Sequence, residues 1–230
     1  MKIFKRIYAP SEYIVIIANG QMHYNQYLQH FIKSAERIIV CDGAINRFAK
    51  LSITPDVIIG DCDSINNKNY QLWQSLIVKD TGQDNNDLSK ALDYLITRTK
   101  VDNCKTKNVI IIGATGLRED HTIGNIGILY DYNHLFNNLS ILSNYGLFNI
   151  IDNRKDNELT SMINVVIGEQ ISFFAFKSNT IINCQELKWP LLNYSLNNWS
   201  SGTLNQAISD TINVVANYPV CIYRAFCIKT

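Results

Sequence analysis

Six aspartates in the first half of the chain stand shortly after apolar runs that are rich in β-branched residues. They are Asp42, Asp61, Asp63, Asp84, Asp87 and Asp120. If these runs are parallel strands joined by helices, their carboxyl ends share one edge of a sheet, where ligands bind in this architecture. The spacing therefore predicts that six carboxylates converge on one cleft.

Clustered carboxylates repel one another, and each resists ionisation unless a cation neutralises the group. Carboxylate oxygens suit Mg²⁺, which takes one or two of them and completes its octahedron with water and substrate phosphates. The aspartates therefore indicate metal-dependent phosphate chemistry. The alternative is that each one ends a turn or caps a helix, which is a common use of aspartate. For Asp87, which would cap a helix starting at Leu88, both interpretations can hold.

A glycine-rich phosphate binder of a known type is absent from the sequence. It contains neither G-x-x-x-x-G-K-[ST] nor G-x-G-x-x-G. The candidate cradle is residues 113–116 (GATG), between an expected strand and an expected helix, where backbone N–H groups could face an anion. A tight turn accounts for these residues equally well.

The elements that must position these residues alternate between strand and helix over the first part of the chain. The expected strands are Tyr13–Ala18, Arg37–Cys41, Asp56–Ile59, Leu76–Lys79 and Asn108–Ile112. Apolar residues at helical spacing predict helices over 24–35 and 88–96, and a third from near His121 toward Phe136. This alternation is typical of a parallel sheet.

Helical periodicity fades beyond Leu139, and short strands follow. The strands expected there are Ser140–Leu142, Phe148–Ile151, Val165–Ile167, Ile171–Phe176, Thr180–Asn183 and Val220–Phe226. We therefore predict an α/β protein with a parallel-sheet, Rossmann-like domain over 1–153 and an antiparallel β-sandwich domain over 154–230. The join is expected in the polar stretch Asp152–Thr160.

Composition excludes several classes of protein. The chain has 230 residues, 47% of them apolar, so it can bury a core. Its 21 basic and 20 acidic residues leave a net charge of +1 with no long basic run, which argues against nucleic acid and membrane partners. The six cysteines form no C-x-x-C, and the apolar run near the start lacks a cleavage pattern. We expect a soluble, cytoplasmic protein.

Four ordered segments of the first domain resemble motifs of the thiamine pyrophosphokinase family. Residues 41–47 (CDGAINR) are similar to its D-G-G-A-N-R, and residues 55–65 (PDVIIGDCDSI) to its P-D-x-x-x-G-D-x-D-S-I. Residues 80–88 (DTGQDNNDL) resemble its D-Q-D-x-T-D-x, and residues 113–121 (GATGLREDH) its G-A-x-G-x-R-x-D-H. Four motifs in order are far more specific than any one of them.

The tail carries a weaker match, in which residues 187–191 (LKWPL) resemble G-L-K-[WY]-x-L and residues 206–210 (QAISD) resemble T-S-I-S-N. The chain also departs from the family. Asn86 stands where Thr is usual, Glu186 where Gly is usual and Asp210 where Asn is usual. The last change bears on substrate recognition, because a carboxylate accepts hydrogen bonds but cannot donate them.

The resemblance implies a thiamine diphosphokinase, in which the hydroxyl of thiamine attacks the β-phosphorus of ATP and AMP leaves. It implies Mg²⁺ as cofactor, ATP as co-substrate, and a homodimer in which thiamine sits between subunits. Such a transfer needs in-line positioning and charge neutralisation more than a protein nucleophile.

The resemblance also assigns roles to individual residues. The expected catalytic residues are Asp61, Asp63, Asp87 and Asp120, of which the first three are the expected metal ligands. The expected nucleotide-binding residues are Asp42, Gly43, Asn46, Arg47, Asp84, Gly113, Thr115, Gly116, Arg118 and His121. The expected thiamine-binding residues are Trp189, Ser209 and Asp210. The alternatives are core packing for Trp189, an ordinary surface position for Ser209 and packing at a helix start for His121.

Two other functions use the same residues. A metal-dependent nucleotide phosphohydrolase would direct water at the phosphate. A non-catalytic sensor would bind nucleotide or thiamine diphosphate without turnover. AMP release that depends on thiamine separates the three.

Overall fold

The computed structural model describes residues 13–82, 84–98, 107–152 and 161–228. The chain forms two compact units, Met1–Asn144 and Tyr145–Thr230, which are described separately. The expected junction between residues 153 and 154 lies outside the described residues. None of the described helices is long and apolar enough to cross a bilayer.

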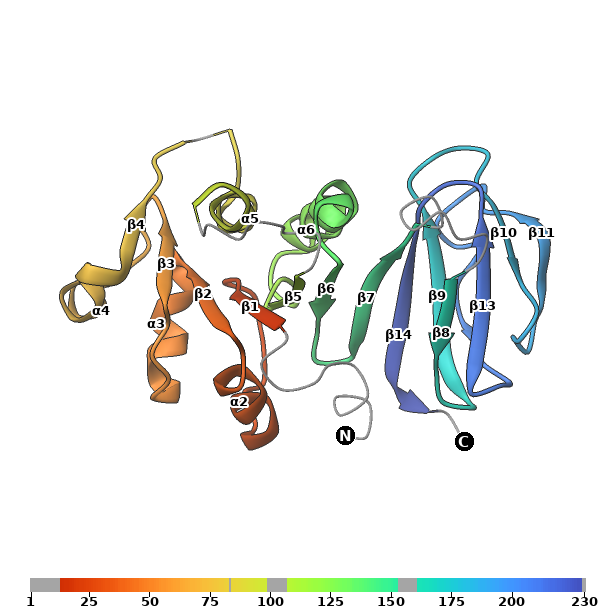
Figure 1. Ribbon diagram of the computed structural model, residues 1–230, viewed down its shortest axis with the longest axis horizontal. Helices are drawn as coiled ribbons and strands as arrows, with labels where there is room; N and C mark the ends of the chain where they lie inside the picture. Colours follow the sequence, from red (N-terminus) through yellow and green to blue (C-terminus); the bar gives the residue numbers. More distant parts are fainter. Residues whose placement is uncertain (1–12, 83, 99–106, 153–160, 229–230) are drawn as a thin grey trace. The chain divides into compact units, whose positions relative to one another are not determined.

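The first unit is built on a parallel sheet (Figure 1). Its described strands are β1 (Tyr13–Ile17), β2 (Arg37–Cys41), β3 (Val57–Gly60), β4 (Ile77–Lys79), β5 (Asn108–Ile112) and β6 (Asn138–Leu142). They lie in the order β6-β5-β1-β2-β3-β4, and every pair is parallel. Each residue of β1 is buried, which explains the unbroken apolar run in the sequence.

The five strands predicted for the first domain are confirmed, with small shifts at their ends. Ser140–Leu142 was grouped with the antiparallel strands that follow it, and this was wrong, because β6 pairs in parallel with β5 and belongs to the sheet of the predicted first domain. Its last four residues are buried, as expected for a strand covered on both faces.

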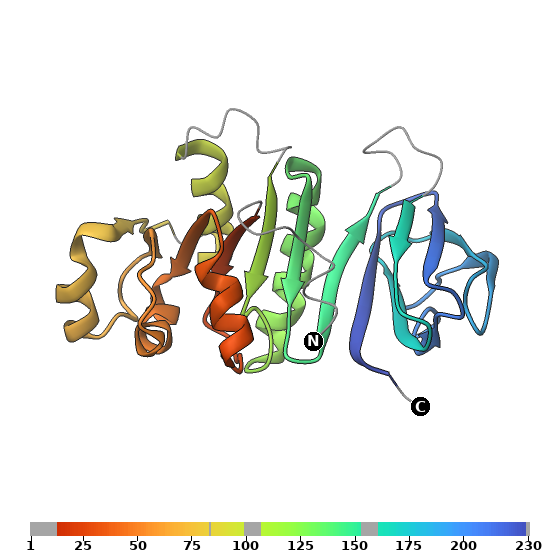
Figure 2. The same cartoon turned by 60° about the horizontal axis from the view of Figure 1, so that its bottom comes forward.

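Helices cover both faces of this sheet. They are α2 (Gln26–Lys33), α3 (Ile45–Phe48), α4 (Asn67–Trp73), α5 (Asp87–Arg98) and α6 (Glu119–Tyr132), with short turns η1 (Asp42–Ala44), η2 (Ala49–Leu51), η3 (Gln74–Leu76) and η5 (Asn133–Leu135). Both ribbon views place α5 and α6 on one face and α2 and α3 on the other (Figure 2). The three predicted helices are confirmed. The helices α3 and α4 were not predicted, because four to seven residues give no clear periodicity.

The order of the strands creates a switch point between β1 and β5. From β1 the chain winds outward through β2, β3 and β4, and it then returns to β5 on the other side of β1. Loops that leave neighbouring strands in opposite directions open a crevice at the carboxyl edge. Here backbone bonds join the two loops, since Gly20 N–H donates to the Gly113 carbonyl at 2.5 Å and Gln21 N–H to the Thr115 carbonyl at 2.8 Å. Gly113 has φ +74°, and a Cβ there would lie 2.7 Å from the Ala18 oxygen.

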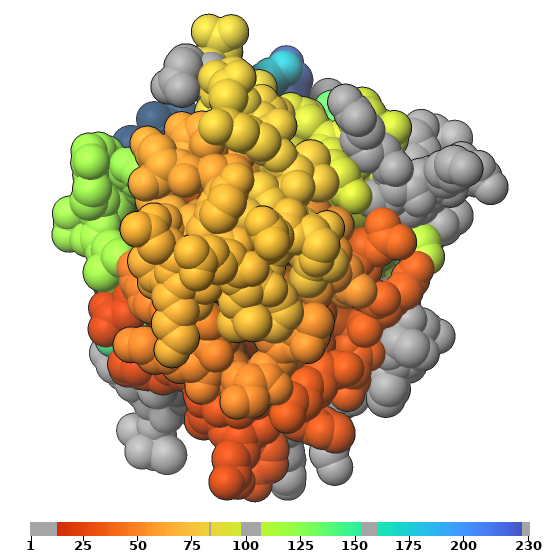
Figure 3. Space-filling model, turned by 90° about the vertical axis from the view of Figure 1, so that its left-hand side faces the viewer, coloured from red at the N-terminus to blue at the C-terminus, as the bar shows by residue number. Residues whose placement is uncertain are grey.

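The edge strand β4 is short. Only three residues of β4 pair with β3, and a short edge strand offers little backbone to another chain. Viewed from this edge, the surface consists mainly of residues from α3 to β4, coloured orange to yellow (Figure 3).

The second unit is a β-sandwich, as predicted. Its described strands are β7 (Gly146–Ile151), β8 (Ser161–Asn164), β9 (Glu169–Ala175), β10 (Ile181–Cys184), β11 (Leu191–Ser195), β12 (Asn205–Gln206), β13 (Thr211–Ala216) and β14 (Val220–Ile228). One layer has the order β12-β9-β14-β7 and the other β11-β10-β13-β8, with antiparallel pairing throughout. The prediction of a strand at Val165–Ile167 was wrong, because β8 ends at Asn164 and a turn follows.

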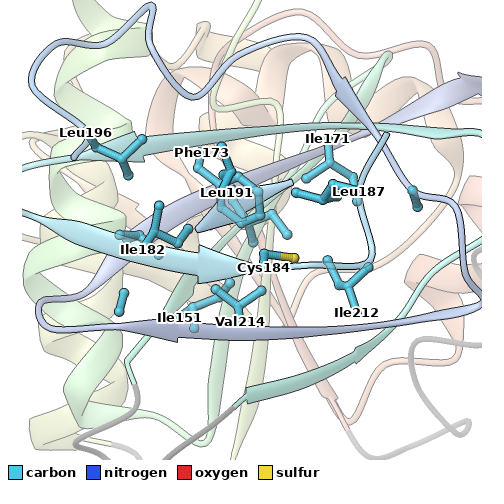
Figure 4. Packing of buried hydrophobic residues seen from close by; sticks show 14 of the residues in the cluster. Ile151, Ile171, Phe173, Ile182, Cys184, Leu187, Leu191, Leu196, Ile212 and Val214 are labelled. Carbon is cyan, nitrogen blue, oxygen red and sulfur yellow. The ribbon is translucent and has the colours of Figure 1, made fainter. Parts of the chain in front are cut away.

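Apolar side chains from both layers meet in the sandwich core (Figure 4). Strand β9 alternates between buried and half-buried residues, so Ile171 and Phe173 point inward beside Ile212 and Val214. The second unit also contains an ion pair whose carboxylate is buried. Arg224 Nε donates to Glu169 Oε1 at 2.7 Å, and Glu169 Oε2 also accepts the Val166 N–H.

Candidate functional site

Three aspartates at the carboxyl edge form an acid trio, defined as Asp42, Asp61 and Asp63. Asp42 opens η1 directly after β2, and the other two follow β3. One carboxylate oxygen from each lies within 4.8 Å of the others. The trio therefore offers the hard oxygen ligands that suit a divalent cation. Among the described residues, the structure groups Asp42 rather than Asp87 with Asp61 and Asp63.

Backbone bonds hold the trio in place. Cys62 N–H donates to Asp42 Oδ2 at 2.7 Å, and Asp63 N–H donates to Asp61 Oδ1 at 3.3 Å. Gly60 lets Asp42 come this close to the loop, because a Cβ at position 60 would lie 2.6 Å from the Asp42 Cβ. The G-D-x-D spacing thus brings the carboxylates of two adjacent strands together.

The members of the trio differ in their tendency to ionise. Asp42 is 1% exposed, and its burial, together with the nearby Asp87 and Asp61, raises its pKa to about 6. The pKa of Asp61 is lowered, mainly because its carboxylate accepts the Asp63 N–H. The fold thus disfavours the ionised form of Asp42 and favours that of Asp61. A bound cation would stabilise the ionised form of both.

Asp87 is the first residue of α5 but does not cap it. The cap is Asn86, whose Oδ1 accepts the Ser89 N–H at 3.0 Å. The interpretation of Asp87 as the cap of a helix starting at Leu88 was therefore wrong. Its carboxylate lies 3.7 Å from the Lys90 ammonium, and burial raises its pKa.

A cleft of about 330 Å³ lies at the switch point. Its walls are the loops after β1 and β5 and the first turns of α5 and α6. Of the predicted site residues, those that line it are Asp87, Gly113, Thr115, Arg118 and His121. The cleft thus combines backbone of a glycine-containing loop, cationic side chains and a carboxylate.

Two predicted nucleotide-binding side chains form bonds within the protein. Asn46 donates to the Ser64 carbonyl at 2.7 Å and accepts the Asn66 side-chain amide at 2.7 Å. Arg47 donates to the Asn19 and Gly20 carbonyls, each at 2.9 Å. Both residues therefore hold loops that border the acid trio and the cleft.

The remaining predicted residues of this domain lie in or near the same loops. Gly43 is buried against the Asn19 side chain. Gly116 is exposed with φ +87°, and Asp84 is exposed just before α5. Neither Gly43, Gly116 nor Asp84 is among the residues that line the cleft.

Asp120 forms an exposed ion pair instead of joining the acid trio. Arg118 Nε and Nη2 donate to the two oxygens of Asp120 at 3.1 and 2.6 Å. His121 N–H donates to the same carboxylate at 2.9 Å. The Arg118 bonds lower the pKa of Asp120, so the carboxylate is a weak base in this arrangement.

Two asparagines connect α5 to the loop after β5. Asn86 Nδ2 donates to Asn125 Oδ1 at 3.2 Å, and Asn125 Nδ2 donates to the Ala114 carbonyl at 2.8 Å. Asn125 lies in α6 and is buried. This amide relay, defined as Asn86, Asn125 and the Ala114 carbonyl, fixes the start of α5 relative to the candidate phosphate cradle.

In the second unit, the predicted thiamine-binding residues lie on two segments that pair with each other. Leu187 forms a bridge with Ala207, and Lys188 N–H donates to the Gln206 carbonyl at 2.8 Å. Trp189 is 56% exposed, so the alternative of core packing was wrong. Its ring lies 5.0 Å from the Lys188 ammonium.

The backbone of Trp189 is held on both sides by one side chain. Asn205 Oδ1 accepts the Trp189 N–H at 3.2 Å, and Asn205 Nδ2 donates to the Trp189 carbonyl at 2.7 Å. Ser209 Oγ accepts the Thr211 N–H at 3.4 Å, and the Asp210 side chain is exposed. Trp189 is thus an exposed aromatic ring on a fixed backbone.

Comparison with known proteins identifies the family. Residues 28–142 match the thiamin pyrophosphokinase catalytic domain, and residues 146–223 match the thiamin pyrophosphokinase substrate-binding domain. The chain belongs to the thiamin pyrophosphokinase family. The resemblance seen in the sequence motifs is therefore confirmed, and the two matched segments fall in the two structural units.

Individual relatives agree with this assignment. Thiamine pyrophosphokinase 1 of Oryza sativa subsp. japonica is 28% identical over 147 residues, which are 55% of this chain and 54% of the relative. Thiamine pyrophosphokinase 2 of Arabidopsis thaliana is 35% identical over 82 residues, which are 34% and 31% of the two chains. The chain thus spans about a third to a half of the length of these curated relatives.

Solved structures show the same fold over nearly the whole chain. Thiamine pyrophosphokinase from Bacillus subtilis has a TM-score of 0.74 at 22% identity, covering 92% of this chain and 98% of that one. The yeast enzyme has a TM-score of 0.76 at 17% identity, covering 99% and 90%.

Several residues of the site were not predicted from the sequence. Asn19 and Gly20 follow β1 at the same carboxyl edge as the aspartates, so their position was a usable signal. Lys90 stands one helical turn after Asp87. Asn125 gave no signal, because a polar residue inside a helix does not reveal which partner it faces.

Proposed function

We propose that the protein transfers the diphosphoryl group of ATP to the hydroxyl of thiamine, giving thiamine diphosphate and AMP. The acid trio beside the switch-point cleft, in a chain that matches both family domains, is the observation that supports this most strongly. The acid trio offers ligands for a cation, and the neighbouring cleft offers space for a phosphate chain.

The first part of the proposal concerns Mg²⁺. Asp61 and Asp63 would hold it, with Asp87 approaching from α5 and the buried Asp42 supporting the loop through Cys62. The donor set fits, because three carboxylates within 4.8 Å of one another offer the oxygen ligands that a hard divalent cation prefers. When bound, the ion neutralises phosphate charge and aligns the diphosphoryl group.

The second part concerns ATP. Its phosphates would lie along the Gly113–Thr115 loop, where backbone N–H groups and the start of α6 favour an anion. Arg118 and His121 line the same cleft and would contact phosphate oxygens. Asp42, Gly43, Asn46, Arg47, Asp84 and Gly116 would support the nucleotide through the surrounding loops.

The third part concerns the proton of the thiamine hydroxyl. Asp120 is a weak base while Arg118 pairs with both of its oxygens. If Arg118 turns to the phosphates of ATP, the pKa of Asp120 rises and its carboxylate can accept the proton. Binding of ATP would thus prepare the base that the alcohol needs.

The fourth part concerns thiamine. Its cationic ring would stack on Trp189 and displace the Lys188 ammonium that now lies over the indole. Ser209 and Asp210 lie on the segment paired with that of Trp189 and would contact the aminopyrimidine. We further propose a homodimer, which would bring this surface of one subunit to the cleft of another. A cytoplasmic location agrees with the four described free cysteines.

The proposed function is tested by measuring AMP with and without thiamine, in ATP and Mg²⁺. We expect AMP to form only when thiamine is present, in equal amount to thiamine diphosphate. A phosphohydrolase would release product from ATP without thiamine. A sensor would release none under either condition.

Replacing Trp189 by Ala should raise the thiamine KM roughly tenfold, because an exposed aromatic ring contributes about 0.5 to 2 kcal/mol to binding a cation. The ATP KM should change little, and the melting temperature should stay near that of the parent because the ring is 56% exposed. Trp189→Phe should retain part of the affinity and Trp189→Leu less. Steady-state kinetics on the three variants measure this.

Trp199 offers a matched control. It is also exposed in part, but its Nε1 donates to the Ala175 carbonyl at 3.0 Å and its ring packs against Phe174 and Phe176. Trp199→Ala should therefore lower stability and leave the thiamine KM unchanged. An unchanged thiamine KM in a stable Trp189→Ala enzyme would contradict the stacking role.

A further inference from the structure

A buried lysine stands beside the acidic residues of the site. Lys90 is 5% exposed and lies in α5, three residues after Asp87. Its Nζ is 3.7 Å from Asp87 Oδ1. Lysine is almost never buried this fully without a charged partner, because desolvating the ammonium is costly. The position of Lys90 therefore indicates that it balances charge in this region.

The charge of Lys90 acts on more than one carboxylate. Its ammonium favours the ionised form of Asp61 as well as that of Asp87. Asp87 in turn interacts with all three members of the acid trio. The trio and Asp87 thus carry up to four negative charges, and the Lys90 ammonium lies next to one of them, on Asp87.

We propose that Lys90 is the resident counter-ion of Asp87 in the proposed metal site. It neutralises the Asp87 carboxylate before any metal binds, which lets that charge remain at the start of α5. The same positive charge opposes a divalent cation and therefore lowers the affinity of the site for it. This inference rests on the proposed metal site.

The first test is thermal melting of the full chain in a chelator. Lys90→Met keeps the length of the side chain and removes its charge, so the melting temperature should fall. Adding Asp87→Asn removes the opposing charge and should restore most of the loss. A role in packing alone predicts that the double variant melts no higher than Lys90→Met, and that result would overturn the proposal. If Lys90→Met does not fold, recovery of a folded protein in the double variant supports it.

The second test measures Mn²⁺ binding by electron paramagnetic resonance, without ATP or thiamine. Lys90→Met should bind Mn²⁺ about tenfold more tightly, because a neighbouring positive charge has been removed. Equal or weaker binding would overturn the proposal. If the parent and the variant both fail to bind Mn²⁺, the metal site itself is wrong, and the inference built on it falls too.

Lys33→Met is the matched control. Lys33 is exposed in the last turn of α2, and the same net charge is lost there, away from the carboxyl edge. Its melting temperature and Mn²⁺ affinity should match those of the parent. If the Lys90 tests fail but the parent protein forms AMP only with thiamine, the inference about Lys90 is wrong and the proposed function is still supported.

Discussion

Replacing Asp61 by Asn should lower kcat by about a thousandfold or more while the protein stays folded. The change removes the charge of a proposed metal ligand and almost none of its volume, and losses of this size follow removal of a single group that stabilises charge in a transition state. Asp63→Asn should behave in the same way. AMP formation in the presence of thiamine, measured across a range of Mg²⁺ concentrations, gives the result.

Asp131→Asn is the control for lost charge, because Asp131 is exposed toward the end of α6. It should retain full activity. Near-normal turnover of Asp61→Asn and Asp63→Asn at saturating Mg²⁺ would exclude the acid trio as the metal site.

Two members of the acid trio have opposite effects on how the stability of the metal-free protein depends on pH. The pKa of Asp61 is lowered in the fold, so its ionised form adds stability that is present at neutral pH and lost as the pH falls. Asp42 is the opposite case, because its pKa is raised to about 6 and the metal-free protein loses stability as the pH rises toward that value. Relief of repulsion is therefore expected at Asp42 and not at Asp61.

Replacing Glu169 by Leu should lower the free energy of unfolding of the second unit by about 3–5 kcal/mol, the usual cost of removing one partner of a buried ion pair. Glu169 is 1% exposed, and its loss leaves the Arg224 Nε–H and the Val166 N–H without an acceptor, while Arg224 Nη2 keeps its bond to the Asn164 carbonyl. Urea unfolding followed by circular dichroism measures the change. A loss below about 1 kcal/mol would show that water reaches the pair.

The double variant Glu169→Leu with Arg224→Met shows whether the loss comes from the unpaired charge. Removing both partners should recover much of the stability, since paired apolar residues often replace a buried ion pair without cost. The exposed pair of Lys107 and Glu36, at 2.8 Å, is the control. Glu36→Gln should cost less than about 1 kcal/mol.

The sequence predicted most of the elements whose residues are buried in a regular pattern, although β13 was missed despite its alternating burial. β1 and β5 read as strands because parallel strands at the centre of a sheet are apolar on both faces. β11 was not predicted, because four of its five residues are exposed and no alternation remains. β6 was identified as a strand but assigned to the wrong sheet, since a short apolar run does not reveal which strand it pairs with.

The sequence predicted where the candidate site lies, but it did not predict which side chains contact one another there. The position of Asp42, Asp61 and Asp63 after adjacent strands placed them at one edge, and the structure brings them together. The pairing of Asp120 with Arg118 could not be predicted, because it depends on side-chain conformations and not on spacing. The internal bonds of Asn46 and Arg47 were missed for the same reason.

The amide relay has a consequence for the conditions under which the site keeps its shape. Its hydrogen bonds join neutral groups, so protons and dissolved ions act on them only weakly. The carboxylates nearby gain or lose charge as the medium changes, whereas the hydrogen bonds that join the start of α5 to the loop after β5 involve no ionisable group. The carboxylates thus respond to the pH and salt of the solution, while the neutral amide relay connects the two segments that carry the cleft.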